Sequence, residues 1–135
     1  MSTSGRARDL GLQAVHYLRK TVNYNDTGIG TADTVKVGRL PAGAFITNTL
    51  VRVDTVFNAA TTNVLTIGTN AASDNNIVAS GDVNEASAIT FVCTTGNGLS
   101  ITSDTDVYAR YTQTGTAATT GKATVVITFA VNNDG

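Results

Sequence analysis

The side chains that could carry nucleophilic chemistry are few, because the sequence contains one histidine, His16, and one cysteine, Cys93. A Cys–His pair activates a thiolate only when the two side chains come within hydrogen-bond reach. Cys93, however, lies in the run "AITFVCTT" in phase with Ile89 and Phe91, which favours a buried thiol behaving as a small hydrophobe. One histidine and one cysteine also leave a zinc site two ligands short, and a single cysteine excludes an internal disulfide. We therefore expect no Cys–His nucleophile, no metal site and no cofactor.

Carboxylates are the second source of chemistry to consider, because glycoside hydrolysis needs two of them beside a sugar. Glu85 is the one glutamate, and Asp104 and Asp106 would point the same way if "SDTD" were extended. The same letters are typical of a polar turn with Asx caps, which is the interpretation we favour. The segments "NYND" and "SDNN" lack the spacing of a calcium loop, and "GIG" lacks the third glycine of a dinucleotide fingerprint. We expect a protein that is not an enzyme.

The composition favours strands over helices. Thr occurs 24 times and Val 15 times, whereas Glu occurs once and Lys three times. β-branched residues suit strands, and the charged residues that favour helices are nearly absent. The net charge is −1, so no overall field draws the chain to nucleic acid or to an acidic membrane. The sequence shows neither a signal-peptide pattern nor an apolar run of membrane-spanning length, so we expect synthesis in a cytoplasm.

Alternating apolar positions, separated by turns rich in Gly, Asn and Asp, predict an all-β fold of about eight short strands. The strands are expected at 14–24, 34–40, 45–57, around Leu65 and Ile67, around Ile89 to Cys93, at "LSIT" (99–102), at 106–113 and at 122–131. The last two are expected to form a hairpin joined by the small-residue loop "GTAATTG" (115–121). The pattern predicts a single-domain antiparallel β-sandwich at 14–135, either jelly-roll or Ig-like, preceded by a flexible N-terminal arm at 1–13.

Basic residues concentrate toward the N-terminus. Residues 1–40 carry six Lys and Arg against three Asp, whereas residues 41–135 carry three against seven acids. Chance among few charges and an arm that docks on an acidic surface both explain this bias. If the arm docks, the candidate contact residues are Arg6, Arg8, Arg19 and Lys20.

The four tyrosines divide between two of the predicted strands, with Tyr17 and Tyr24 at 14–24 and Tyr108 and Tyr111 at 106–113. If these strands were adjacent, the tyrosines would form a patch able to contact a sugar, a partner protein or a second copy of the chain. Ordinary strand packing is the alternative.

The segments "LPAGAFITNTLVRVDTVFNAATTNVLTIGT" (40–69) and "DTDVYARYTQTGTAATTGKATVVITF" (104–129) resemble small β-sandwich proteins of tailed bacteriophages. These are the capsid decoration, or cement, proteins, some of which have a jelly-roll fold. The features that carry the resemblance are the "PAGA" turn at Pro41, the strand end "VxVxTxFNA", the "LTIGT" strand, and a "DVYA" strand followed by a loop of Gly, Thr and Ala. The resemblance covers about the C-terminal two-thirds of the chain and includes no catalytic signature.

The resemblance implies a viral structural protein with a jelly-roll-like fold that assembles as a homodimer or homotrimer. Such a protein would decorate the exterior of an assembled capsid in the virion and stabilise it by bridging major capsid protein subunits. Neither nucleic acid nor a membrane is an expected partner. The resemblance supplies no motif residues, so the candidate contacts above rest on this sequence alone. The alternative is a receptor- or carbohydrate-binding module of a phage tail or head fibre, whose domains show similar patterns.

Overall fold

The structure is a computed structural model that describes residues 16–26, 34–70 and 75–131. Within these ranges the regular elements are all β-strands, and every pairing between strands is antiparallel. The seven strands are β1 (His16–Asn23), β2 (Val35–Leu40), β3 (Phe45–Thr55), β4 (Thr62–Gly68), β5 (Thr90–Cys93), β6 (Thr105–Thr114) and β7 (Lys122–Ala130). The predicted all-β class is confirmed.

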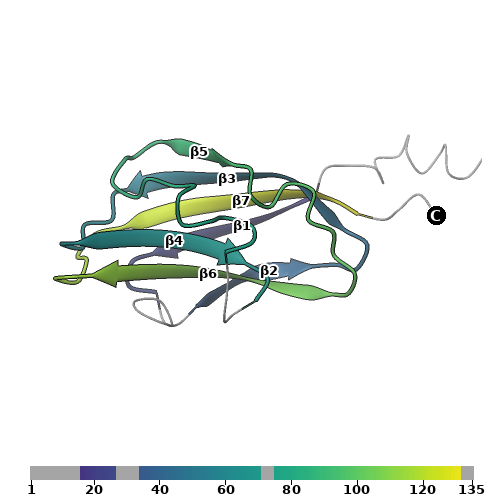
Figure 1. Cartoon of the computed structure of the whole chain (residues 1–135), viewed down its shortest axis with the longest axis horizontal. Coiled ribbons are helices and arrows are strands. Elements are labelled where there is room, and N and C mark those ends of the chain that lie inside the picture. Colours follow the sequence, from purple (N-terminus) through teal and green to yellow (C-terminus); the bar gives the residue numbers. More distant parts are fainter. Residues whose placement is uncertain (1–15, 27–33, 71–74, 132–135) are drawn as a thin grey trace, which may run out of the picture.

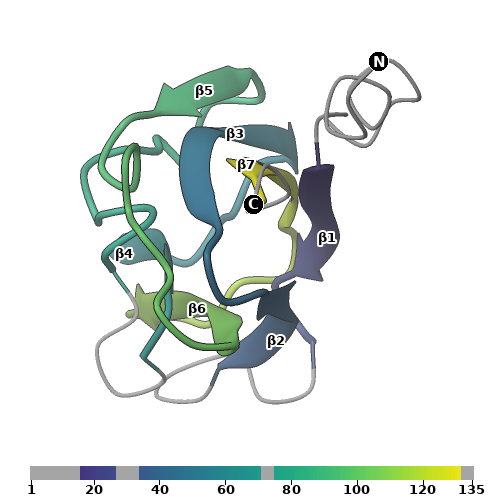
Figure 2. The ribbon, with the colours of Figure 1, turned by 90° about the vertical axis from the view of Figure 1, so that its right-hand side faces the viewer.

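The strands form two sheets that face each other as two layers (Figures 1 and 2). The odd-numbered strands make a four-stranded sheet in the order β1-β7-β3-β5, and the even-numbered strands make a three-stranded sheet in the order β2-β6-β4. Consecutive strands therefore always lie in opposite sheets, and every connection crosses from one layer to the other. This arrangement confirms the predicted single-domain antiparallel β-sandwich.

The strand pairings are nested inside one another. The first strand pairs with the last, β2 pairs with β6, and β3 pairs with β5. Innermost, Ile67 of β4 forms an isolated antiparallel bridge with Val78. Such nesting results when one long antiparallel hairpin is folded over a core, which is the connectivity of an eight-stranded jelly roll. The bridge at Val78 stands where the fifth of those eight strands would lie, so the jelly-roll alternative is favoured over the Ig-like one.

The core is the layer of apolar side chains between the two sheets. Val51 and Val53 of β3 and Val125 and Ile127 of β7 point inward and are at most 1% exposed, as the period-two alternation of strands requires. The three-stranded sheet contributes a matching set of fully buried residues: Leu40, Leu65, Ile67, Val107, Ala109 and Tyr111. The outward positions of each strand remain for contact with solvent or a partner.

Two predicted details are wrong: the hairpin between β6 and β7, and a strand at "LSIT". β6 and β7 do not form a hairpin, because β6 lies between β2 and β4 while β7 lies between β1 and β3. Two alternating runs joined by a short loop look the same in sequence whether they form a hairpin or an arch between two sheets, and consecutive strands usually pair. The segment "LSIT" is not a strand, since Ser100 forms only an isolated bridge with Phe45.

The chain's proline, Pro41, lies in the turn that connects β2 to β3. The Ala44 N–H donates to the Pro41 carbonyl at 3.1 Å, and Gly43 has a φ of 87°. A positive φ at this position is what a type II β-turn requires, and glycine adopts it without a steric cost. The turn is held from outside by Asp104, whose carboxylate accepts the Ala42 N–H at 2.9 Å.

Candidate functional site: the outer face of the four-stranded sheet

The structure keeps His16 and Cys93 apart. His16 lies on β1 and Cys93 on β5, at opposite edges of the four-stranded sheet, so three strand spacings of about 4.8 Å separate their strands. The His16 ring packs near Phe129, with 5.9 Å between ring centroids. Cys93 is 1% exposed, as the sequence predicts, and its burial raises the pKa of the thiol to about 11. A buried neutral thiol at this distance from the imidazole does not form a nucleophilic pair with it.

The three carboxylates that were candidates for acid–base chemistry are each engaged in other contacts. Asp104 caps the Pro41 turn, and Asp106 bonds to the Arg39 Nε at 2.9 Å and to the Lys36 Nζ at 3.2 Å. The hydrogen bond from Arg39, followed by that from Lys36, holds the pKa of Asp106 below its usual value. Glu85 is buried elsewhere, where its Oε1 accepts the Leu65 N–H at 2.7 Å. The polar turn with Asx caps that was expected for "SDTD" is not what these contacts show. Asp106 lies within β6 and bonds to basic side chains, and Asp104 accepts a backbone N–H from a residue 62 positions earlier in the chain.

No group of three or more metal-ligating side chains occurs in the part of the chain that the structure describes. In "NYND", the Asp26 carboxylate is occupied in accepting the Asn23 backbone N–H at 2.8 Å. "SDNN" begins outside the described residues, and its Asn76 side chain bonds to the backbone N–H and hydroxyl of Thr69. No helix of a length and apolarity suited to crossing a membrane is found among the described ranges.

The tyrosines do not form one patch, because β1 and β6 belong to different sheets. Tyr17 is 62% exposed on the outer side of β1, and Tyr24 packs against the core just beyond the end of β1. Tyr108 lies at an outward position of β6. Tyr111 is fully buried and donates to the Asn63 side chain, so it is a core residue and not a surface contact.

Of the four basic candidates, Arg6 and Arg8 lie outside the described residues. Arg19 and Lys20 are neighbours on β1, so their side chains leave opposite faces of the strand. Arg19 is exposed on the outer face, in phase with Tyr17, whereas the half-buried Lys20 lies on the core side, paired in register with the buried Val125. Arg19 and Tyr17 therefore share one surface, and Lys20 does not belong to it.

That surface, the outer face of the four-stranded sheet, carries a row of side chains that crosses all four strands. Arg19 of β1 is in register with Val126 of β7, Val126 with Leu50 of β3, and Leu50 with Val92 of β5. Side chains at directly paired positions lie about 5 Å apart at their Cβ atoms and touch across the strands. The result is an apolar strip of three residues with a guanidinium at one end.

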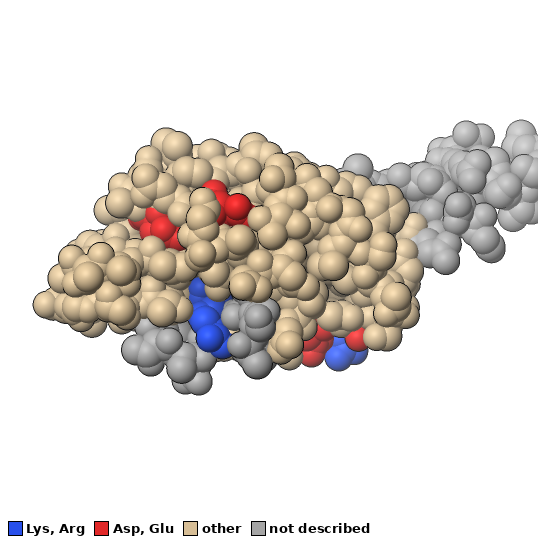
Figure 3. Space-filling view, viewed as in Figure 1, with Lys and Arg blue, Asp and Glu red and all other residues tan. Residues whose placement is uncertain are grey.

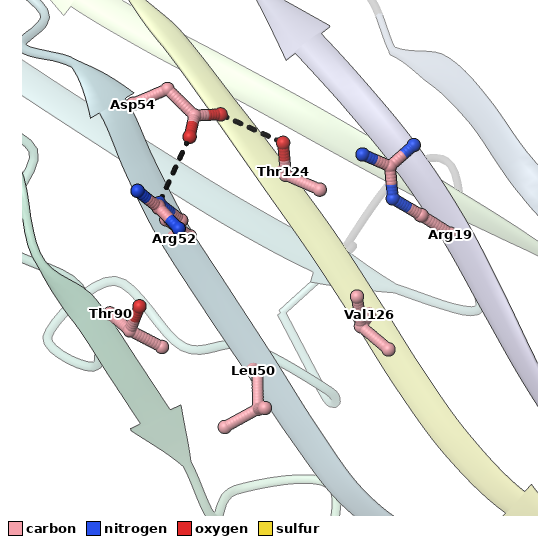
Figure 4. Close-up of a pocket in the computed structure, with 7 residues that line it drawn as sticks. All are labelled: Arg19, Leu50, Arg52, Asp54, Thr90, Thr124 and Val126. Atoms are coloured by element: carbon pink, nitrogen blue, oxygen red, sulfur yellow. Dashed lines mark hydrogen bonds and ion pairs between the residues drawn. The ribbon is translucent and has the colours of Figure 1, made fainter.

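Polar and charged side chains border the apolar strip (Figure 4). The next row carries Arg52 on β3 and Thr124 on β7, and Asp54 follows on β3. Asp54 pairs with the Arg52 Nε at 3.2 Å and accepts the Thr124 hydroxyl at 2.8 Å. Among the described residues, Arg19 has no ion-pair partner. The seven side chains labelled in Figure 4 line a shallow depression of about 330 Å³ in this face.

Sequence reasoning identified Arg19 and Tyr17 but missed Leu50, Val92 and Val126. The signal was present, because these three residues are apolar at positions out of phase with the buried alternation of their strands. An apolar residue at one outward position is ordinary, and only the register between strands shows that the three are adjacent.

Figure 3 shows the molecule from the same side as Figure 1, with β4 and β6 toward the front. The surface on this side is mostly uncharged and carries a few separate acidic and basic groups.

No family model and no curated protein match the sequence. Solved structures do match the fold. A chain of the "Cyanophage Pam1 capsid asymmetric unit" superposes with a TM-score of 0.66 at 24% identity, covering 88% of this chain and 86% of that one. The acid-stable capsid of Helicobacter pylori bacteriophage KHP30 contains a chain with a TM-score of 0.64 at 15% identity, covering 87% of both chains. In the capsid of Ralstonia phage GP4 the values are 0.61 and 15%, with 88% and 85% covered. This chain therefore has, over nearly its whole length, the fold of chains found in three phage capsid structures.

Proposed function

We propose that this protein is a structural component of a phage particle, which decorates the exterior of the assembled capsid and stabilises it by bridging major capsid protein subunits. The observation that carries the proposal is the reciprocal, nearly full-length match to chains of three phage capsids. Coverage is nearly equal in both directions, so each matched chain is about as long as this one and has no large additional domain. A protein of this size and fold is suited to adding onto a shell that other subunits build.

The chemistry of the chain supports a binding role. His16 and Cys93 lie on opposite edges of one sheet, and the carboxylates Asp104 and Asp106 are engaged by the backbone and by basic side chains. What remains on the surface is Thr-rich and weakly charged, which suits broad static contacts because short side chains lose little entropy when they are ordered. We propose that the chain acts as a homodimer or homotrimer, so that each assembly reaches several capsid subunits at once.

The proposed mechanism is mass action. A protein that binds the assembled shell, and not its dissociated subunits, stabilises the shell by its binding free energy at every occupied position. To test this, purified protein is mixed with empty shells made from the major capsid protein of the same phage, and the shells are sedimented. We expect saturable binding at a fixed ratio and a higher temperature of shell disruption. Failure of the protein to sediment with shells at any concentration would contradict the proposal.

We also propose that residues 1–13 contribute to capsid contact through Arg6 and Arg8, which would approach acidic patches on the shell. Deleting residues 2–13 should weaken binding to shells while the circular dichroism and melting temperature of the β-sandwich remain unchanged. Binding that is undiminished by the deletion would remove the arm from the mechanism and leave the decoration function in place.

The alternative, a receptor- or carbohydrate-binding module of a phage tail or head fibre, was suggested by a similar pattern of strands and turns, and a cluster of tyrosines would have supported it. The separation of Tyr17 from Tyr108 and the burial of Tyr111 remove that cluster as support. A glycan array showing saturable binding that is lost in a Tyr17→Ala or Tyr108→Ala variant would restore it.

A further inference from the structure

We infer that the outer face of the four-stranded sheet, centred on Leu50, Val92 and Val126 and bordered by Arg19 and Arg52, is the surface that docks on the capsid. We further infer that its partner there is an apolar patch bordered by carboxylates. This inference rests on the proposed function and specifies which surface performs it.

Exposed apolar side chains are distributed unequally between the two sheets. The large apolar residues that are more than a third exposed in the described chain are Tyr17, Phe45, Val56, Ile89 and Val92. Each of them lies on β1, β3 or β5 or within one residue of β3 or β5, and none lies on β2, β4 or β6. An exposed apolar surface with a polar border is the usual composition of a protein-contact site, whereas single exposed apolar residues are ordinary. The concentration on one sheet therefore distinguishes its outer face from that of the other sheet.

The apolar strip is built into the sheet. Val126, Leu50 and Val92 follow one another across β7, β3 and β5 in hydrogen-bonded register, so their relative positions are held by the backbone ladders. Val92 is 65% exposed, which means that most of its apolar surface is still available to a partner. A rigid sheet face loses little conformational entropy on binding, which favours affinity.

The charges on this face indicate the chemistry of the partner. It carries two guanidinium groups, from Arg19 and Arg52, the exposed ammonium group of Lys122 at an outward position of β7, and one carboxylate, from Asp54. The Asp54 carboxylate already forms an ion pair with Arg52 and accepts a hydrogen bond from the Thr124 hydroxyl. Arg19 has no ion-pair partner in the described ranges. A partner that supplies carboxylates opposite Arg19 would complete the pairing and guide the approach of the two surfaces.

A second copy of the chain meets these requirements poorly. Packing this face against itself would bring together four guanidinium groups, two ammonium groups and two carboxylates, and like charges within an interface oppose association. On the outer face of the other sheet, two of the basic groups, Lys36 and Arg39, are already paired with Asp106. An acidic partner is therefore favoured at the four-stranded sheet and not at the three-stranded one.

The experiment compares shell binding by wild type, Arg19→Glu, Val92→Glu and a control, Thr112→Glu, which adds the same carboxylate at an outward position of β6. All three sites are on the surface of strands, so circular dichroism and melting temperature establish first that each variant is folded. We expect Arg19→Glu and Val92→Glu each to weaken binding about tenfold or more, as interface contacts do, and Thr112→Glu to bind as wild type does. Binding of wild type should also weaken with added salt, and that dependence should be smaller for a neutral Arg19→Gln variant.

The outcomes separate the two proposals. If wild type does not bind shells, the decoration function fails and this inference with it. If wild type binds and both face variants bind equally well, or if Thr112→Glu alone loses binding, the docking face is wrong and the function stands. Analytical ultracentrifugation tests whether a second copy of the chain occupies this face instead. The assignment to the capsid would be overturned if the face variants were monomeric where wild type is oligomeric, and if both forms bound shells equally well.

Discussion

Gly121 packs directly against the aromatic ring of Phe57. A Cβ placed on Gly121 would overlap the ring edge, falling 2.7 Å from Cε2 and 2.8 Å from Cγ, and the residue has a φ of 153°. Phe57 is 2% exposed and stacks in a tilted arrangement on Tyr111, with 4.6 Å between ring centroids. The close approach occurs where the chain crosses from β6 to β7. Gly121 therefore packs the connection between the two sheets directly onto the buried Phe57 ring.

This contact predicts that Gly121→Ala is strongly destabilising. The added methyl group must displace the Phe57 ring, which is confined by Tyr111, and the backbone conformation is unfavourable for a residue with a side chain. Overpacking of a core costs about 1–3 kcal/mol, so we expect a loss of about 2 kcal/mol or more in the free energy of unfolding. Gly81→Ala is the matched control, because a Cβ there meets no atom within 4 Å. Equal urea midpoints for the two variants would contradict the assigned role of Gly121.

Thr49→Val should stabilise the protein. Thr49 is fully buried in β3, and its hydroxyl has no hydrogen-bond partner among the described residues. A buried hydroxyl without a partner costs about 1–3 kcal/mol, so replacing it with a methyl group of similar shape should raise the free energy of unfolding by about 1 kcal/mol. Thr47→Val is the control on the same strand, because the exposed Thr47 hydroxyl donates to the Thr128 carbonyl at 3.1 Å and should give no gain. Urea unfolding followed by circular dichroism measures both, and a loss of stability in Thr49→Val would show that its hydroxyl is satisfied.

Glu85 predicts a pH dependence of stability. Burial raises the pKa of its carboxyl above 4.5, because the charged form loses hydration, although the Leu65 N–H partly compensates. The folded state therefore binds the proton more tightly than the unfolded state does. Stability from this group is fully present below the unfolded value and is lost as the pH rises through the folded pKa.

Glu85→Gln isolates this effect, since an amide oxygen can still accept the Leu65 N–H but carries no charge. The free energy of unfolding is measured for both proteins between pH 4 and neutrality, in steps of about one pH unit. We expect the value for wild type minus the value for Glu85→Gln to decrease as the pH rises. Other carboxylates titrate in both proteins and cancel in the difference. A difference that stays constant, or that grows with pH, would show that the Glu85 carboxyl is not penalised by burial.

The Cys93 thiol should react slowly in the folded protein. Its pKa of about 11, raised by burial and then by the charge of Asp82, leaves little thiolate at pH 8, and the side chain is 1% exposed. Alkylation by iodoacetamide should therefore be much slower in the native state than in 8 M urea, where the thiol has an ordinary pKa of about 8.5. The same protein in denaturant is its own control, and equal rates in the two states would place Cys93 at the surface.

The positions of the strands could be predicted from the sequence because the signals for them are local. Alternation of apolar and polar residues, bounded by turns rich in Gly and Asn, located six of the seven strands to within two residues at each end and placed β4 around Leu65 and Ile67. The burial of Cys93 followed from the same local pattern. The partners of Asp104 and Asp106 did not, because they lie more than 60 residues away in the chain. The strand positions and the burial of Cys93 depend on residues that are neighbours in the chain, so a short stretch of sequence is enough to predict them.

The tertiary structure alone decided which strands are partners. The hairpin expected for β6 and β7 is an arch, and the tyrosines of β1 and β6 lie in different sheets, because β6 pairs with β2 and β4 over long loops. The row Arg19–Val126–Leu50–Val92 joins residues from four separate parts of the sequence. Such pairing depends on two opposing contributions to the free energy: the burial gained when both sheets close over a shared core, and the entropy lost when long loops are closed. Both involve residues far apart in the chain, so no local stretch of sequence predicts the result.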